Sequence, residues 1–250
     1  MGRLRVPVGW SHHFHGMVNQ FMAYAIKICG ITSPDDASML SGTGIDYLGV
    51  LVNVTPSPRS VPVETAAGII AASKVPVIVL TYDHSPAEVQ DVVEALHPAG
   101  VQLAGSESER YIASLRDTID VEIWKSVHLP ARETGNDVSG PLAAQINRFA
   151  RIGVNRVVLD TALSRNTVVL KGGTGQPCDW SIAARVRKQV DMFLFLAGGI
   201  HPGNVREALL QVGPDGVDMS SGVERSIGRK DPALVKSLVF EVRISAHNKT

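Results

Sequence analysis

From residue 25 onward, the chain alternates short runs of apolar, often β-branched residues with longer amphipathic runs. Most of the short runs are continuously apolar, which is typical of parallel strands that are covered by helices. We therefore predict eight strands, over residues 25–29, 47–52, 75–82, 100–103, 121–127, 156–160, 193–197 and 216–219.

The amphipathic stretches between these strands predict eight helices, and two of them begin with a clear start signal. Ser33 before Pro34 and Ser85 before Pro86 each place a capping side chain ahead of a proline, which the first helical position tolerates. Asp179 is expected to cap a later helix. We predict helices over residues 34–41, 63–73, 86–96, 106–115, 141–151, 180–189, 203–211 and 231–242.

Eight successive βα units predict an α/β fold, a single (β/α)8 TIM barrel of the phosphate-binding type, for which roughly 250 residues are typical. A doubly wound open sheet is the structural alternative, but the unbroken run of units favours closure. The predicted barrel domain covers residues 25–245, and no linker divides it. The glycine-rich stretch 162–179 follows the sixth strand, on the face where such barrels place their active sites.

Residues 1–24 have neither helical nor strand periodicity, so we expect an irregular N-terminal extension. A metal site is one interpretation of His12, His13 and His15, but the stretch contains no Asp, Glu or Cys to complete it. We prefer a disordered extension or a true start at Met22, and we expect no metal.

Composition excludes several classes of partner. Lys plus Arg and Asp plus Glu balance at 24 each, so the chain has no net charge to favour nucleic acid or an anionic membrane. No apolar run reaches the ~20 residues of a membrane span, and the first residues lack a secretory signal. With two cysteines, a disulfide framework is not expected. We therefore expect a cytoplasmic protein with a small-molecule ligand.

Glycine clusters follow the predicted strands at the positions where this type of barrel binds phosphate. Gly198 and Gly199 follow the seventh strand, and Ser221 and Gly222 follow the eighth. Glycine lets the backbone approach a ligand closely, so that N–H groups can point at phosphate oxygens. A third cluster, Gly172-Gly173-Thr174-Gly175, lies in the loop after the sixth strand.

Two reactive side chains end predicted strands. Cys29 ends the first and Asp160 the sixth, where barrel enzymes carry catalytic groups. A thiol, with a usual pKa of about 8.5, becomes a useful base when a nearby cation or helix N-terminus lowers that pKa. Cys178 has no such placement and is interpreted as a packing residue. Asp218, inside the eighth strand, forms either an internal hydrogen bond or a contact with a ligand.

Arg59 follows Ser57 and Pro58 in a proline-stiffened loop after the second strand. A guanidinium held in this way suits bidentate binding of a carboxylate. From the residues alone, a solvated surface arginine is the preferred interpretation.

Several segments, in order along the chain, resemble the phosphoribosylanthranilate isomerase family. The resemblance runs from about residue 25 to residue 242, nearly the whole predicted barrel. The segments are Lys27-Ile28-Cys29-Gly30, Ser57-Pro58-Arg59, Gln102-Leu103, Gly172-Gly173-Thr174-Gly175 with Asp179-Trp180, Gly198-Gly199-Ile200 with Pro202 and Asn204-Val205, and Asp218 with Ser220-Ser221-Gly222-Val223-Glu224.

The resemblance implies an isomerase of tryptophan biosynthesis that needs no metal or organic cofactor. Its Amadori rearrangement turns N-(5-phosphoribosyl)anthranilate into 1-(2-carboxyphenylamino)-1-deoxyribulose 5-phosphate. Asp160 would be the general acid and Cys29, as thiolate, the general base. Arg59 would hold the anthranilate carboxylate, and Gln102 would also contact the substrate. The phosphate would be held by Gly172, Gly173, Gly198, Gly199, Ser220, Ser221 and Gly222. We expect a monomer or homodimer.

Two features depart from the usual family pattern, both toward the aryl end of the substrate. The family usually has Gln-Leu-His-Gly at strand four, where this chain has Ala104 in place of the histidine, and the loop before Ser57 is about one residue longer. An Amadori isomerase with a different phosphoribosyl amine as substrate and a non-catalytic phosphate-ligand-binding barrel therefore stay open as alternatives. A barrel of the indoleglycerol-phosphate synthase type would need lysines at strand ends, which Lys27 and Lys125 match poorly.

Overall fold

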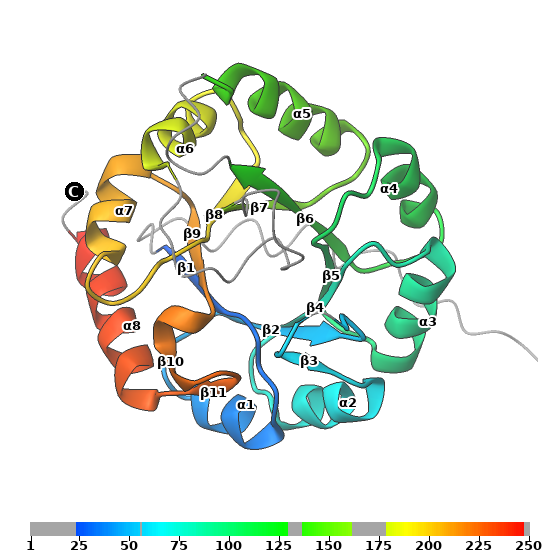
Figure 1. The fold of residues 1–250 in the computed structure, drawn as a ribbon, viewed down its shortest axis with the longest axis horizontal. Helices are drawn as coiled ribbons and strands as arrows, with labels where there is room; N and C mark the ends of the chain where they lie inside the picture. The colour runs from blue at the N-terminus through cyan, green and yellow to red at the C-terminus, as the bar shows by residue number, and fades with distance from the viewer. Residues whose placement is uncertain (1–23, 56, 130–136, 162–178, 248–250) are drawn as a thin grey trace, which may run out of the picture.

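The computed structural model describes residues 24–55, 57–129, 137–161 and 179–247. Eight parallel strands form a closed ring (Figure 1). The ring closes because Lys27 of the first strand pairs in register with Tyr47 of the second and with Asp218 of the last. The predicted closed barrel is confirmed, and the open sheet is excluded. The strands are β1 (Ala25–Ile28), β2 (Tyr47–Val52), β4 (Val77–Thr81), β5 (Gly100–Leu103), β6 (Glu122–Leu129), β7 (Arg156–Thr161), β8 (Phe193–Leu196) and β9 (Gly216–Met219).

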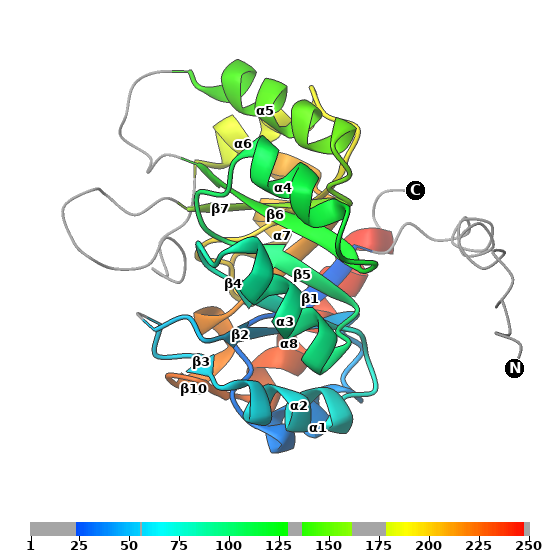
Figure 2. The ribbon, with the colours of Figure 1, turned by 90° about the vertical axis from the view of Figure 1, so that its right-hand side faces the viewer.

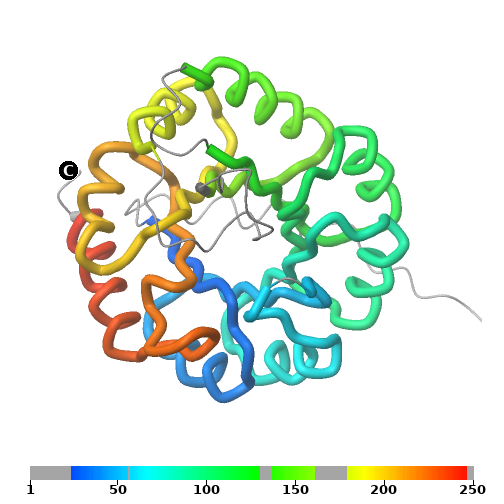
Figure 3. The backbone as a smooth tube through the Cα atoms, viewed as in Figure 1, coloured from blue at the N-terminus to red at the C-terminus, as the bar shows by residue number. Residues whose placement is uncertain are grey.

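The helices form an outer ring around the strands, which the backbone tube shows clearly (Figure 3). None of them, within the part of the chain that the structure describes, is long and apolar enough to cross a membrane. They are α1 (Pro34–Leu40), α2 (Val63–Ala72), α3 (Pro86–Leu96), α4 (Glu109–Arg116), α5 (Ser139–Arg151), α6 (Trp180–Arg187), α7 (Val205–Val212) and α8 (Pro232–His247).

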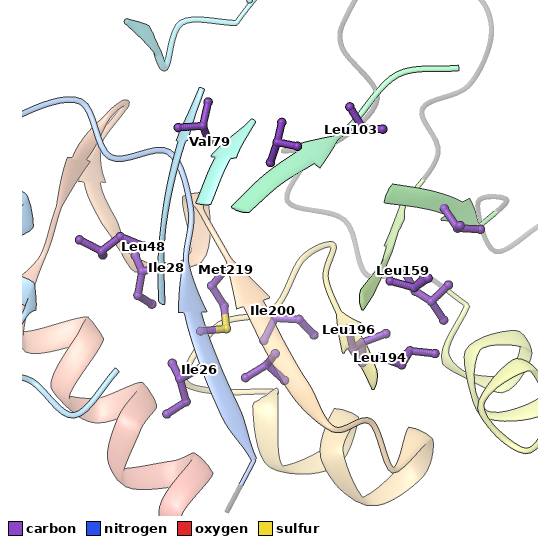
Figure 4. Close-up of a cluster of buried hydrophobic side chains, with 14 of the residues drawn as sticks. Ile26, Ile28, Leu48, Val79, Leu103, Leu159, Leu194, Leu196, Ile200 and Met219 are labelled. Carbon is purple, nitrogen blue, oxygen red and sulfur yellow. The ribbon is translucent and has the colours of Figure 1, made fainter. Parts of the chain in front are cut away.

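Apolar side chains between the strands and the helices form one large core. Ile26, Leu48 and Leu194 are completely buried in it. Figure 4 shows members of this core from strands on different sides of the ring. The continuous apolar runs in the sequence reflect strands that are covered on both faces.

A smaller cluster fills the inside of the barrel at its amino-terminal end. The indole ring of Trp124 stacks on Phe195 at 4.9 Å and meets the edge of Tyr47 at 5.1 Å. The guanidinium of Arg156 lies 4.7 Å from the centre of the Phe193 ring. Because Tyr47, Arg156 and Phe193 are the first residues of their strands, this cluster closes the floor of the barrel, away from the strand ends that carry Cys29 and Asp160.

Helix α4 begins three residues later than the sequence predicted. Ser108 is its N-cap and accepts a hydrogen bond from the backbone N–H of Tyr111. The two residues before it, Ser106 and Glu107, are used elsewhere: the Ser106 N–H donates to Asp83, and Glu107 forms an ion pair with Lys125 at 2.9 Å. Tertiary contacts therefore decide where this helix starts.

Four short elements were not predicted. β3 (Ser60–Val61) adds to the edge of β2, η1 (Ser221–Val223) is a short 3-10 helix after β9, and β10 (Glu224–Ser226) with β11 (Arg229–Lys230) forms a hairpin. All four lie in loops that follow the carboxyl ends of β2 and β9. In the side view, β3 and β10 lie near one another at the same end of the molecule (Figure 2).

The predicted N-terminal extension lies outside the described residues, except for its last residue. Tyr24 is buried, and its carbonyl oxygen accepts a hydrogen bond from Arg243 at 2.8 Å. Gly172, Gly173 and Cys178 also lie outside the described residues.

Candidate active site

A pocket opens at the carboxyl ends of the strands, and each of the eight barrel strands, or the loop after it, contributes to its wall. The structure brings together in this pocket all the predicted site residues that it describes. They are Cys29, Arg59, Gln102, Asp160, Gly198, Gly199, Ser220, Ser221 and Gly222.

Cys29 directly follows β1 and is 8% exposed at the pocket wall. Lys27 lies two residues earlier, so its side chain faces the same side of the strand. Gly49 of β2 makes room for both, since a Cβ at that position would lie 2.9 Å from the Cys29 sulfur and 3.1 Å from the Lys27 Nζ. The glycine inside this otherwise apolar strand is therefore explained by a close approach of side chains from β1.

Two opposing influences act on the Cys29 thiol. Burial raises its pKa above the usual value, and the nearby Asp218 carboxylate adds to this effect. The positive charges of Lys27 and Lys230 lower the pKa, and Lys27 has the larger effect of the two. Burial prevails in the ligand-free protein, so the lysines determine how far the thiol can still ionise.

Asp160 enters the pocket from β7, where it pairs in register with His128 of β6. Between β7 and β1 lie β8 and β9, the two strands whose loops carry the predicted phosphate site. The carboxyl group and the thiol thus flank these loops from both sides.

The loop after β8 has the backbone conformation that its glycines predict. Gly198 and Gly199 have φ angles of 85° and 65°, in the left-handed region that favours glycine. Asn204 fixes the loop, because its side chain donates to the Gly199 carbonyl at 2.8 Å and accepts from the N–H of His201 at 2.8 Å. A Cβ on Gly222 would overlap the carbonyl oxygen of Ile200. The loops after β8 and β9 are therefore in direct contact.

Arg59 also lines the pocket, but its guanidinium already has a protein partner. Its Nε and Nη2 donate to the two carboxylate oxygens of Glu224 at 2.8 and 2.6 Å. Lys230 donates to the same carboxylate at 2.8 Å and to the Ser220 carbonyl at 3.1 Å. Gly30 lets Arg59 approach, since a Cβ there would lie 2.6 Å from the Arg59 Cδ. The role of Arg59 as a carboxylate-binding residue stays a prediction.

Glu224 and Lys230 were not predicted as members of the site. Burial raises the pKa of Glu224, but the hydrogen bond from Arg59 and the charge of Lys230 outweigh it, so the pKa lies below the usual value. The carboxylate is therefore held in its ionised form. A signal was present in Ile227-Gly228, which fits a tight turn between two short strands.

A histidine stands next to Ala104, the position where the resembled family usually has one. His128 Nε2 lies 3.2 Å from the Ala104 carbonyl oxygen, and both residues line the pocket. Sequence reasoning missed His128 because it ended this strand at residue 127, whereas β6 continues to Leu129. Beside them, the Gln102 side chain donates to the Ser126 hydroxyl at 3.0 Å.

Across the described ranges, no group of three or more His, Cys, Asp or Glu side chains is arranged to hold a metal ion.

Comparison with known proteins agrees with this geometry. A family model described as N-(5'-phosphoribosyl)anthranilate (PRA) isomerase matches residues 26–241. N-(5'-phosphoribosyl)anthranilate isomerase 1 of Methanosarcina mazei is 34% identical over 228 residues, which cover 87% of this chain and 94% of that protein.

Solved structures give the same result. Monomers generated from the dimeric phosphoribosylanthranilate isomerase of Thermotoga maritima superpose with a TM-score of 0.70 at 27% identity, covering 88% of this chain and 98% of theirs. A phosphoribosyl anthranilate isomerase in complex with reduced 1-(o-carboxyphenylamino)-1-deoxyribulose 5-phosphate reaches 0.71 at 25% identity, covering 88% and 98%. The chain therefore belongs to the N-(5'-phosphoribosyl)anthranilate isomerase family.

Proposed function

We propose that this protein catalyses the Amadori rearrangement of N-(5'-phosphoribosyl)anthranilate, with Asp160 as general acid and Cys29 as general base. The observation that carries the proposal is their placement: both line one pocket, on either side of the two glycine loops. A sugar phosphate held by those loops would present its reacting carbons between the two groups. The relative with a bound reduced product analogue supports the choice of substrate class.

In the first step, Asp160 donates a proton to the furanose ring oxygen as the ring opens to a Schiff base. Cys29, as thiolate, then removes the proton from C2 to give an enolamine, which tautomerises to the ketone. The step requires a protonated carboxyl group and an ionised thiol at the same time, the reverse of their usual order, and the surrounding charges must supply this. The buried cations beside Cys29 act in the required direction.

The phosphate would be bound by backbone N–H groups of Gly198, Gly199, Ser221 and Gly222, with Ser220 beside them. The left-handed conformations of the first two expose backbone where a side chain would block the ligand. Gly172 and Gly173 are proposed to complete this site. At the anthranilate end of the substrate, Arg59 is proposed to bind the carboxylate. Its Nη1 is available for this, because it forms no hydrogen bond with the described residues.

The test is turnover of N-(5'-phosphoribosyl)anthranilate by the purified protein, together with growth of a tryptophan auxotroph that lacks this isomerase. Growth and turnover that both depend on Asp160 are the expected result. If the protein turned over another phosphoribosyl amine but not N-(5'-phosphoribosyl)anthranilate, the amine part of the substrate would have to be reassigned. Tight binding of the substrate without any turnover would favour the non-catalytic barrel. Light scattering of the same sample decides between monomer and homodimer.

A further inference from the structure

A lysine is completely buried inside the barrel directly below Cys29. Lys27 has no exposed surface, and its Nζ donates to the Asp218 Oδ2 at 2.7 Å across the β1–β9 ladder. Burial lowers the pKa of Lys27, but the charge of Asp218 and that of an ionised Cys29 raise it more, so the net pKa lies above the usual value. The side chain is therefore an ammonium ion.

This ammonium ion is shared between two anionic positions. An ammonium group has three N–H donors, of which one reaches Asp218. The Nζ and the Cys29 sulfur face the same side of the strand, and a Cβ on Gly49 would lie 3.1 Å from the one and 2.9 Å from the other. The Asp218 Oδ1 is buried and has no hydrogen-bond partner within the described ranges. Asp218 thus holds Lys27 through one oxygen only.

We propose that Lys27 is a positioning residue that stabilises the thiolate form of Cys29, and that Asp218 sets how much of the Lys27 charge reaches the sulfur. The proposal rests on the proposed role of Cys29 as general base. It gives a function to a buried ion pair, which is by itself weak evidence for stability because apolar residues of similar volume often stabilise a core as well or better.

Other charges near Cys29 are already engaged. Lys230 approaches from β11, but its ammonium is bonded to Glu224 and to the Ser220 carbonyl. Arg59, in the loop after β2, is bonded to the same Glu224. Lys27 also has a carboxylate partner, but it lies two residues before Cys29 on the same side of β1, and its charge lowers the pKa of the thiol more than that of Lys230 does.

The experiment measures the ionisation of Cys29 directly, without substrate. In a Cys178→Ser background Cys29 is the single thiol, and its alkylation by iodoacetamide is followed against pH. Lys27→Met removes the cation, so the pKa of Cys29 rises and about tenfold less thiolate is present at neutral pH. Asp218→Asn removes the competing anion, so the pKa of Cys29 falls. A pair whose charges do not reach the sulfur would shift the pKa of Cys29 in neither direction.

Lys125→Met is the matched control. Lys125 is also a buried lysine in an ion pair, with Glu107 at 2.9 Å, but it does not line the pocket. Removing the charge of Lys125 should leave the measured pKa of Cys29 unchanged. If Lys27→Met does not fold because Asp218 is left unpaired, the double variant Lys27→Met/Asp218→Asn removes both charges and should still raise the pKa of Cys29.

Kinetics supply a second readout. In Lys27→Met, kcat should fall about tenfold at neutral pH and recover as pH rises, with KM little changed. The proposal is overturned if the single and double variants titrate like the parent, or if Asp218→Asn raises the pKa of Cys29. Failure of the proposed function looks different: full turnover by Cys29→Ser would remove Cys29 as base, whatever the thiol titration shows.

Discussion

Arg59 and Glu224, 165 residues apart in the chain, are joined by two parallel hydrogen bonds of 2.8 and 2.6 Å. Lys230 donates to the same carboxylate from β11. The loop after β2 and the hairpin after β9 are therefore tied together at the mouth of the pocket. One carboxylate offsets two cations there.

Glu224→Gln should lower the free energy of unfolding by about 3 kcal/mol, because it leaves two largely buried cations without their carboxylate. Urea unfolding followed by circular dichroism measures this. Glu109→Gln is the control, since Glu109 and Arg148 form an equally short ion pair that is exposed, and its loss should change stability by less than about 1 kcal/mol. Equal effects of the two substitutions would contradict the buried network.

The same carboxylate predicts a dependence of stability on pH. The pKa of Glu224 is lower in the folded protein than its usual value, so its contribution is present at neutral pH and is lost as pH falls through the folded-state pKa. Urea midpoints of the parent should therefore fall more steeply below pH ~4.5, the ordinary range of a glutamate, than those of Glu224→Gln. Parallel curves would show that another group dominates acid unfolding.

Cys29→Ser should lower kcat by at least about a hundredfold, because a hydroxyl is a far weaker base than a thiolate at neutral pH. Asp160→Asn should be similarly damaging, since an amide cannot supply the proton. Both residues line an open pocket, so melting temperatures should stay near that of the parent. Near-normal turnover by either variant would sink the corresponding assignment.

Gly199→Val should raise KM sharply, because a branched side chain would occupy the proposed phosphate site and resists a φ of 65°. Inorganic phosphate or sulfate should compete with substrate in the parent and much less in the variant. Gly213→Val is the control for backbone strain, since Gly213 has a φ of 64° at the end of α7 and open space around it. It should lower stability without changing KM.

A chain that begins at Met22 should match the full chain in melting temperature and in turnover. Residues 1–21 have no periodic apolar pattern, so they can bury little surface. Tyr24, which is buried against the barrel, is kept. A fall of several degrees in the shortened chain would show that the extension docks on the barrel.

The barrel was predictable because each strand carries its own signal. β2, β5, β9 and α3 begin and end at the predicted residues, since turns, prolines and caps mark them locally. The start of α4 was missed because Ser106 and Glu107 contact Asp83 and Lys125. The end of β6 was missed because its pairing with β7 continues to Leu129. Such contacts join segments that the sequence keeps apart.

The candidate site divides in the same way. Cys29 and Asp160 can be recognised in the sequence because each ends an apolar strand, the position where barrel enzymes carry catalytic groups. Lys27 lies inside an apolar strand rather than at its end, and its role depends on Asp218, which a strand pairing places beside it. Glu224 gave no sign of its two partners, since the hairpin that positions it was not predicted. The sequence therefore shows which residues of the site are charged, but it does not show which of them pair with one another.

The pairing of Lys27 with Asp218 also bears on the order in which the protein is made. The two residues are 191 positions apart. During synthesis, the ammonium ion of Lys27 on β1 therefore has no counter-ion until β9 has been made. A nascent chain that ends before β9 cannot bury Lys27 without leaving its charge unpaired. Early products therefore keep the inside of the first strand open to water, and the reactive thiol acquires its setting only when the ring closes. Activity therefore depends on the presence of β9, and products of translation that end before it should be inert.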